Sequence, residues 1–161
     1  MAKSIFLKVT NGIDGESVFT KHEKQIDVLS WSWGAHNQGT RHVSTGGAHG
    51  KAEVSDLTIT KYVDKASAKL LNAVCTGQHI DKATLYQLKS AGDQHADYIE
   101  IELSEVFVTS YTTGGSESQG LVTEHITLNF RKFKFEYKVQ GDKGKAESGG
   151  ECTFDVAKQA K

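Results

Sequence analysis

The sequence predicts a mainly β fold: a compact β-barrel of two packed, mostly antiparallel sheets, with one short α-helix at about residues 64–76 on its side. Three observations support this prediction. Segments rich in Val, Ile, Phe, Tyr and Thr alternate with glycine-bearing turns. Proline is absent, so every backbone N–H can enter a hydrogen-bond ladder. Apolar positions also change parity at four places, as in long strands that bend around one core.

The composition is that of a folded protein, and we expect a single domain over residues 1–161. Apolar residues make up 37% of the chain, and the 16 glycines bring the total into the usual globular range. The net charge of −1 argues against binding to duplex DNA or to anionic membranes. No apolar run is long enough for a signal peptide or a membrane span. We therefore expect synthesis in the cytoplasm and no stable membrane insertion.

Strand signals recur along the whole chain. The predicted strands cover residues 4–9, 26–33, 52–60, 82–89, 97–109, 121–139 and 151–157. Between them, the longest stretch without a strand pattern is an extended loop at about 34–51. The C-terminal part, at about 140–161, is rich in glycine and lysine.

The parity changes are the strongest sign of curvature. They fall between Val28 and Trp31, Val54 and Leu57, Ser104 and Glu105, and Arg131 and Lys132. Each change indicates either a bulge or a strand that buries different faces at its two ends. Together they favour a closed or nearly closed barrel, or two packed sheets that share strands.

The predicted helix begins near Asp64, whose side chain can cap the first turn. Its apolar side is formed by Leu70, Leu71 and Val74. Gly77 follows as a terminal residue that tolerates positive φ. A helix this short is marginal alone, so we expect it to pack on the sheet.

No catalytic, cofactor or metal site is predicted. The loop histidines are spaced by 6 and 7 residues: His36, His42 and His49. On a glycine-rich loop this spacing provides neither preorganisation nor a fourth ligand, so we expect solvated or interface histidines. Cys75 and Cys152 are expected to be free thiols, with Cys75 packed as a small hydrophobe on the helix.

Two other functions stay open from the residues alone. Segment 131–138 alternates basic and aromatic residues, as a platform for single-stranded nucleic acid does. A strand with buried aromatic and exposed basic residues has the same pattern, and the net charge favours that interpretation. The second alternative is an enzyme whose active site is assembled from distant residues, which no motif supports.

Two strings are specific when they occur together, WSWG at 31–34 and TKYVDKAS at 60–67, and GGS at 114–116 and LVTE at 121–124 are further matches. With them the chain resembles the haemolysin-coregulated protein (Hcp) family, the tube protein of bacterial type VI secretion systems. The resemblance covers residues 4–139, whereas the part after Val139 matches poorly.

The resemblance implies a structural role without catalysis or cofactors. Family members are similar in forming hexameric rings that stack into a hollow tube, which a contractile sheath expels. The implied partners are further copies of the chain, the spike protein, the sheath and small effector cargo carried or chaperoned in the lumen, with no nucleic acid. The implied destination is the extracellular space or a target cell.

The extended loop is the candidate contact to a neighbouring subunit or ring. Its length and glycine content are unusual for a connection inside a compact domain. The residues expected to make this contact are Thr40, Arg41, His42, Val43 and Ser44.

Overall fold

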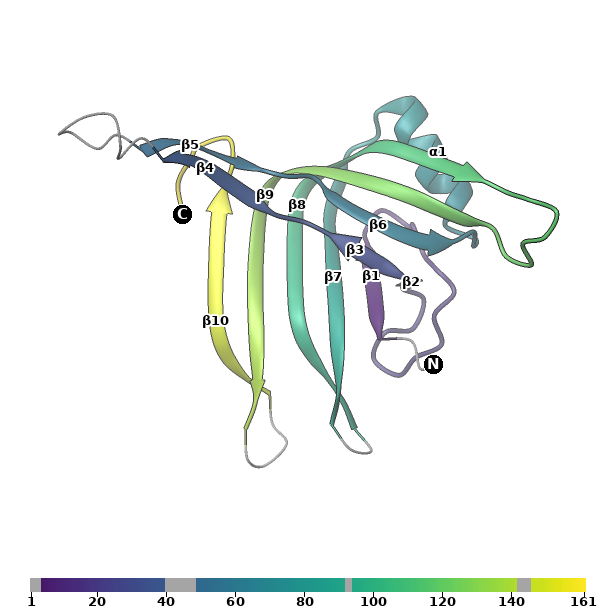
Figure 1. The fold of residues 1–161 in the computed structure, drawn as a ribbon, viewed down its shortest axis with the longest axis horizontal. Coiled ribbons are helices and arrows are strands. Elements are labelled where there is room, and N and C mark those ends of the chain that lie inside the picture. Colours follow the sequence, from purple (N-terminus) through teal and green to yellow (C-terminus); the bar gives the residue numbers. More distant parts are fainter. Residues whose placement is uncertain (1–3, 40–48, 92–93, 142–145) are drawn as a thin grey trace.

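A computed structural model describes residues 4–39, 49–91, 94–141 and 146–161, and these residues form an antiparallel β structure with one helix (Figure 1). The predicted fold class is confirmed. The strands are β1 (Ile5–Val9), β2 (Ile26–Asp27), β3 (Ser30–Ser32), β4 (Ala35–Gly39), β5 (His49–Val54), β6 (Leu57–Tyr62), β7 (Ile80–Ala91), β8 (Gln94–Gly114), β9 (Thr123–Gln140) and β10 (Ala146–Asp155). The helix, α1, covers Ser67–Thr76.

The two sheets are very unequal. Strands β4 and β5 form a two-stranded sheet, and the other eight strands form one large sheet in the order β2-β1-β7-β8-β9-β6-β3, with β10 beside β9. Strand β9 organises the large sheet, because it pairs with β8 along most of its length. Its other edge pairs first with β6 and then with β10.

The segment from β2 to β3 closes the large sheet into a barrel. Strand β2 pairs with β1, and β3 pairs with β6, at opposite ends of the sheet path. Between them, the Val28 N–H donates to Ile5 O at 3.0 Å, and the Leu29 N–H donates to Thr60 O at 2.8 Å. The parity change before Trp31 therefore marks the point where the chain leaves β1 for β6. The change between Val54 and Leu57 likewise lies between two strands, β5 and β6.

The other two parity changes lie opposite each other and mark one bend across the sheet. Ser104 pairs with Lys132 and Val106 with Phe130, so the register is unbroken there. The ring centroids of Phe130 and Phe133 are 6.2 Å apart, so both rings lie on the same side of the sheet. The same face of the sheet therefore stays buried on both sides of the bend. In each strand, the alternation of inward and outward side chains shifts by one residue at this point. In β8, the shift occurs at Glu105, whose backbone has a φ of +53°. Above their straight lower halves, both strands curve strongly (Figure 1).

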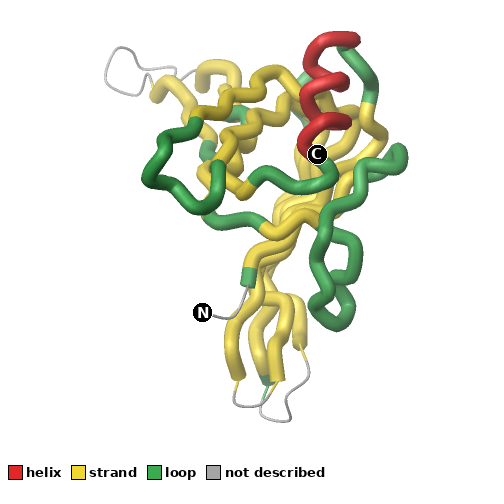
Figure 2. The backbone as a smooth tube through the Cα atoms, turned by 90° about the vertical axis from the view of Figure 1, so that its right-hand side faces the viewer, coloured by secondary structure: helices red, strands yellow, loops and turns green. Residues whose placement is uncertain are grey.

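Helix α1 packs beside the upper part of β8, at the wide end of the molecule (Figure 2). It begins at Ser67, later than predicted, and its N-cap residue Ala66 makes no side-chain cap hydrogen bond. Asp64 accepts instead the N–H of Ala66 at 2.8 Å, in the turn before the helix. Gly77 ends the helix with φ +63°, as predicted.

The buried side of α1 differs in part from the prediction. It consists of Ser67, Leu70 and Ala73, at a spacing of three residues, and Leu71 is 44% exposed. Cys75 lies outside this stripe and is exposed, so its predicted packing as a small hydrophobe is wrong. Both Cys75 and Cys152 are free and exposed. No helix among the described residues combines the length and the apolar character that crossing a membrane requires.

The stretch predicted as an extended loop at 34–51 contains strand at both ends, which corrects that prediction. Strands β4 and β5 pair there and project from the barrel (Figure 1). Every residue of β4 is exposed, so it has no apolar alternation that would have indicated a strand. Gln159 joins the base of this hairpin to the C-terminal segment, with hydrogen bonds to both backbone groups of Ala52 at 3.0 and 3.2 Å.

Gly15 allows the loop after β1 to pass close to the start of β2. A Cβ atom at this position would lie 2.4 Å from Gln25 O. We predict that Gly15→Ala destabilises the fold by about 1–3 kcal/mol, because the backbone must move to admit the methyl group. Gly34→Ala is the matched control, since nothing lies within 4 Å of its added Cβ. Urea unfolding of both variants tests this prediction, and equal midpoints would contradict it.

Candidate functional site

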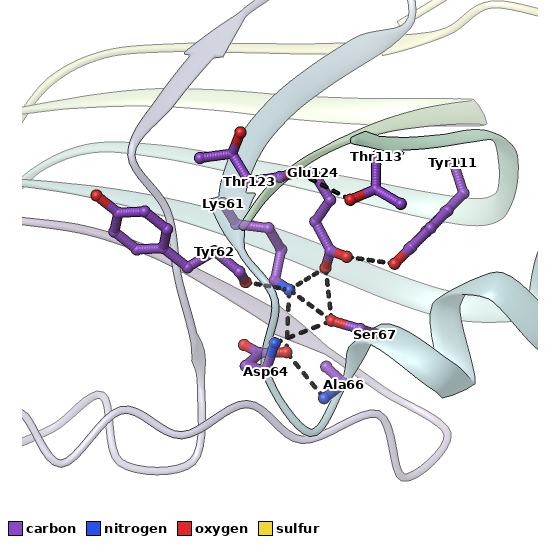
Figure 3. A network of polar contacts seen from close by, with 9 residues as sticks. All are labelled: Lys61, Tyr62, Asp64, Ala66, Ser67, Tyr111, Thr113, Thr123 and Glu124. Atoms are coloured by element: carbon purple, nitrogen blue, oxygen red, sulfur yellow. Dashed lines mark hydrogen bonds and ion pairs between the residues drawn. The ribbon is translucent and has the colours of Figure 1, made fainter. Parts of the chain in front are cut away.

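The predicted contact residues Thr40, Arg41, His42, Val43 and Ser44 lie outside the described residues. Of the loop histidines, His36 contacts Glu53 at the surface across the β4–β5 hairpin, with 2.9 Å between its Nε2 and a carboxylate oxygen. Within the described ranges, no group of three or more His, Cys, Asp or Glu side chains could hold a metal ion. The most developed polar site in this part of the chain is instead a buried network between β6, β8, β9 and α1 (Figure 3).

Lys61 on β6 and Glu124 on β9 form the centre of this network. They are direct partners in the β6–β9 ladder, and both side chains are fully buried. Strand alternation places Lys61 on the inward face with Leu57 and Ile59. It places Glu124 on the inward face of β9 in the same way, in line with Ile126.

The Lys61 ammonium group has four oxygen partners. It donates to a Glu124 carboxylate oxygen, to Asp64 Oδ1 at 2.9 Å, to the Tyr62 carbonyl at 2.9 Å and to Ser67 Oγ at 3.3 Å (Figure 3). A buried cation is costly unless it is paired and hydrogen-bonded, and these contacts supply both conditions.

The Glu124 carboxylate is equally well satisfied. Ser67 Oγ donates to Oε1 at 2.7 Å, and the Tyr111 hydroxyl from β8 donates to Oε2. Ser67 Oγ also accepts the Asp64 N–H at 2.9 Å. The first residue of α1 is thus tied both to the ion pair and to the turn that precedes the helix.

The network changes the pKa of two of its members. Burial alone would raise the pKa of Glu124, but hydrogen bonds from Lys61, Tyr111 and Ser67 lower it below its usual value. Burial and the neighbouring Glu124 carboxylate raise the pKa of Tyr111 to about 12. The network therefore favours an ionised glutamate and a neutral tyrosine.

The network joins four elements, and its donors and acceptors point at one another. This arrangement is suited to fixing the helix and three strands in one geometry. Apart from Tyr111, its residues come from the strings TKYVDKAS and LVTE, but sequence reasoning did not recognise their structural role. One signal could have revealed it: Lys61 and Glu124 both fall in the inward phase of an apolar alternation.

The aromatic residues of segment 131–138 do not form an exposed platform. Phe133 is buried, and Phe135 packs against the core. The intervening lysines pair with acidic residues of neighbouring strands: Lys134 with Glu151 at 3.5 Å, and Lys138 with Glu100 at 2.9 Å. The structure therefore favours the half-buried strand over the base-stacking interpretation.

We predict that Glu124→Gln destabilises the protein by about 3–5 kcal/mol, because Lys61 would lose its fully buried carboxylate partner and keep only Asp64, whose side chain is 11% exposed. The matched control is Glu102→Gln, which removes a carboxylate from an exposed pair with Lys82 at 3.2 Å. Such surface pairs contribute at most about 1 kcal/mol. The free energy of unfolding in urea distinguishes the two variants. Equal losses would show that the buried pair does not hold the fold.

The raised pKa of Tyr111 predicts a pH dependence of stability. The folded state favours the neutral phenol of Tyr111. The neutral phenol therefore stabilises the folded state fully below about pH 10, the ordinary tyrosine pKa. This stabilisation is lost as the pH rises toward the folded pKa of about 12. We expect the free energy of unfolding to fall more steeply in this window for the wild type than for Tyr111→Phe. Tyr62→Phe, at an exposed position, should keep the wild-type slope. Identical slopes for the wild type and Tyr111→Phe would contradict the assignment.

The chain is similar to known proteins in sequence and in fold. The sequence model of a family described as "Type VI secretion system effector, Hcp" matches residues 6–137. The relative "Protein hcp1" from Pseudomonas aeruginosa is 40% identical over 154 residues, which cover 96% of this chain and 94% of the relative.

Two solved structures have the same fold. One, described as "Structure of a type six secretion system protein", has a TM-score of 0.88, 32% identity and 98% coverage of both chains. Hcp1 from Salmonella typhimurium has a TM-score of 0.78, 34% identity and 99% coverage of both chains. The expected resemblance is thereby confirmed, and the chain belongs to the Hcp family of type VI secretion system proteins.

Proposed function

We propose that the chain is the structural subunit of a type VI secretion tube, in which six copies form a ring and rings stack into a hollow cylinder. Membership of the Hcp family supports this role. In the proposal, a contractile sheath expels the tube from the cytoplasm, with a spike protein and small effectors as further partners. The role is mechanical and requires no catalysis by this chain.

The observation that carries the proposal is the β4–β5 hairpin, which projects from the barrel (Figure 1). A ring requires a heterologous contact, in which one surface of a subunit meets a different surface of the next. A projecting hairpin on one side of a barrel supplies such an asymmetric surface. The contact expected of Thr40, Arg41, His42, Val43 and Ser44 belongs to this proposal.

Self-assembly is tested by the solution mass of the purified protein and by negative-stain images. We expect six-membered rings with about six times the chain mass of 17.6 kDa. A chain that stays monomeric at every accessible concentration would overturn the proposal.

The same measurements test the loop. The double variant Arg41→Asp and Val43→Asp should lose ring or tube formation. If this variant still forms rings and tubes, the loop does not make the contact between subunits or rings.

A further inference from the structure

The β4–β5 hairpin has few ties to the rest of the molecule. Among the described residues it forms a two-stranded sheet of its own, so no ladder joins it to the large sheet. Val54 at its base packs against the core. Beyond Val54, the hydrogen bonds of Gln159 are the only ones within the described ranges that join the hairpin to another part of the chain. Lys51 of β5 and Ala157 line one groove of about 580 Å³, so the hairpin is not packed tightly against the C-terminal segment there.

The side-chain amide of Gln159 pairs with the free edge of β5 as a strand residue would. The Ala52 N–H donates to Gln159 Oε1 at 3.0 Å, and Gln159 Nε2 donates to Ala52 O at 3.2 Å. In an antiparallel ladder, two opposed residues exchange both hydrogen bonds in the same way. A glutamine amide carries the donor and the acceptor that this exchange requires. Asn37 of β4 is the ladder partner of Ala52, so Gln159 extends the small sheet on its other side.

The turn that carries Gln159 is closed by its own hydrogen bonds. Asp155, the last residue of β10, and Ala160 pair through two N–H to O bonds, at 2.8 and 3.4 Å. Asp155 Oδ1 also accepts the Lys158 N–H at 2.9 Å. We call residues 155–160 the C-terminal clasp. It lies beside the base of the hairpin (Figure 1).

The clasp is in turn fastened to β9 at the bend of the large sheet. The Val156 N–H donates to Arg131 O at 2.8 Å, and Asp155 Oδ2 lies 3.6 Å from Arg131 Nε. Gln159 Nε2 donates to Val156 O at 2.8 Å, which orients the amide within the clasp. The amide that holds β5 is therefore fixed relative to the barrel.

The backbone of Gln159 indicates that its side chain, and not the turn, requires glutamine. Its φ is +54°, in the left-handed region. Glycine adopts this region readily, and asparagine does so more easily than most other residues. A residue with a long side chain keeps such a conformation only where the surrounding structure holds it.

We propose that Gln159 is a positioning residue for assembly, which fixes the direction in which the β4–β5 hairpin projects toward the next copy. The inference rests on the proposed function, in which this hairpin supplies the asymmetric contact surface. A surface that samples several orientations binds more weakly, in proportion to the time it spends in the competent one. A fixed hairpin therefore favours a closed ring, in which every contact repeats the same geometry.

Gln159→Gly separates this role from a role in the turn. Glycine suits the positive φ, so the barrel should keep the wild-type midpoint of urea unfolding. Loss of the amide should raise the concentration needed for ring formation by on the order of 10-fold, because the hairpin is no longer held in one direction. Lys158→Ala is the matched control. It truncates an exposed side chain of the same turn, keeps the backbone bond to Asp155, and should assemble as the wild type does.

Ala52→Pro removes the same contact from the other side. Proline lacks the N–H that Gln159 Oε1 accepts, and it is tolerated where the N–H of an edge strand points outward. The single variants should lose assembly to a similar extent. The double variant should assemble no worse than the weaker single variant, because both changes remove one contact. Additive losses would contradict this shared role.

Hydrogen exchange of the Ala52 N–H measures the contact directly. In Gln159→Gly this N–H should exchange on the order of 10-fold faster, whereas the core strands should keep their protection. Wild-type ring formation by Gln159→Gly, or a loss of barrel stability that matches its loss of assembly, would overturn the positioning role and leave the proposed tube function intact. A monomeric wild type would overturn the tube function and, with it, the assembly role of Gln159, whatever the exchange shows.

Discussion

The buried ion pair between Lys61 and Glu124 is the interaction on which the upper part of the barrel depends. Neither side chain is exposed, and the two residues are directly opposed in the β6–β9 ladder. A slip of one residue would turn Lys61 away from its partner and leave Glu124 as an unpaired buried charge. The pair thus sets the register of β6 on β9. Through Ser67 and Tyr111 it also fixes where α1 begins and where β8 passes.

Closure of the sheet is the second constraint, and it follows from a short stretch of chain. Strands β2 and β3 are only two residues apart, yet they pair with strands at opposite ends of the sheet. Their connection joins β1 to β6 through the Val28 and Leu29 N–H groups. The bend across β8 and β9 keeps one face of the sheet buried while the strands change direction. Curvature and closure together leave β10 and the β4–β5 hairpin outside the closed barrel.

The sequence predicted the class of fold well because strand alternation and glycine turns are local signals. It also located the bend at Glu105 and the end of the helix at Gly77. It failed for β4, whose five residues are all exposed and show no alternation, and for Cys75, whose face depends on which helix residues meet the sheet. The buried network was missed because its central contacts join residues far apart in the sequence: Glu124 lies 63 positions from Lys61 and 57 from Ser67. The alternation of apolar residues along a strand shows which face of the sheet a residue occupies, but it does not show which residue it contacts.

The order of pairing along the chain has a consequence for how the protein is made. Strand β1 must wait for its partner β7, and β6 must wait for residues Thr123 to Leu128 of β9. Until the ribosome has added Glu124, Lys61 lacks its fully buried carboxylate partner, and β6 lacks the strand with which it pairs along its whole length. Contacts between residues this distant make folding slow relative to helical proteins. The nascent chain therefore stays open during most of its synthesis, and its apolar strands are exposed to solvent before the barrel can close.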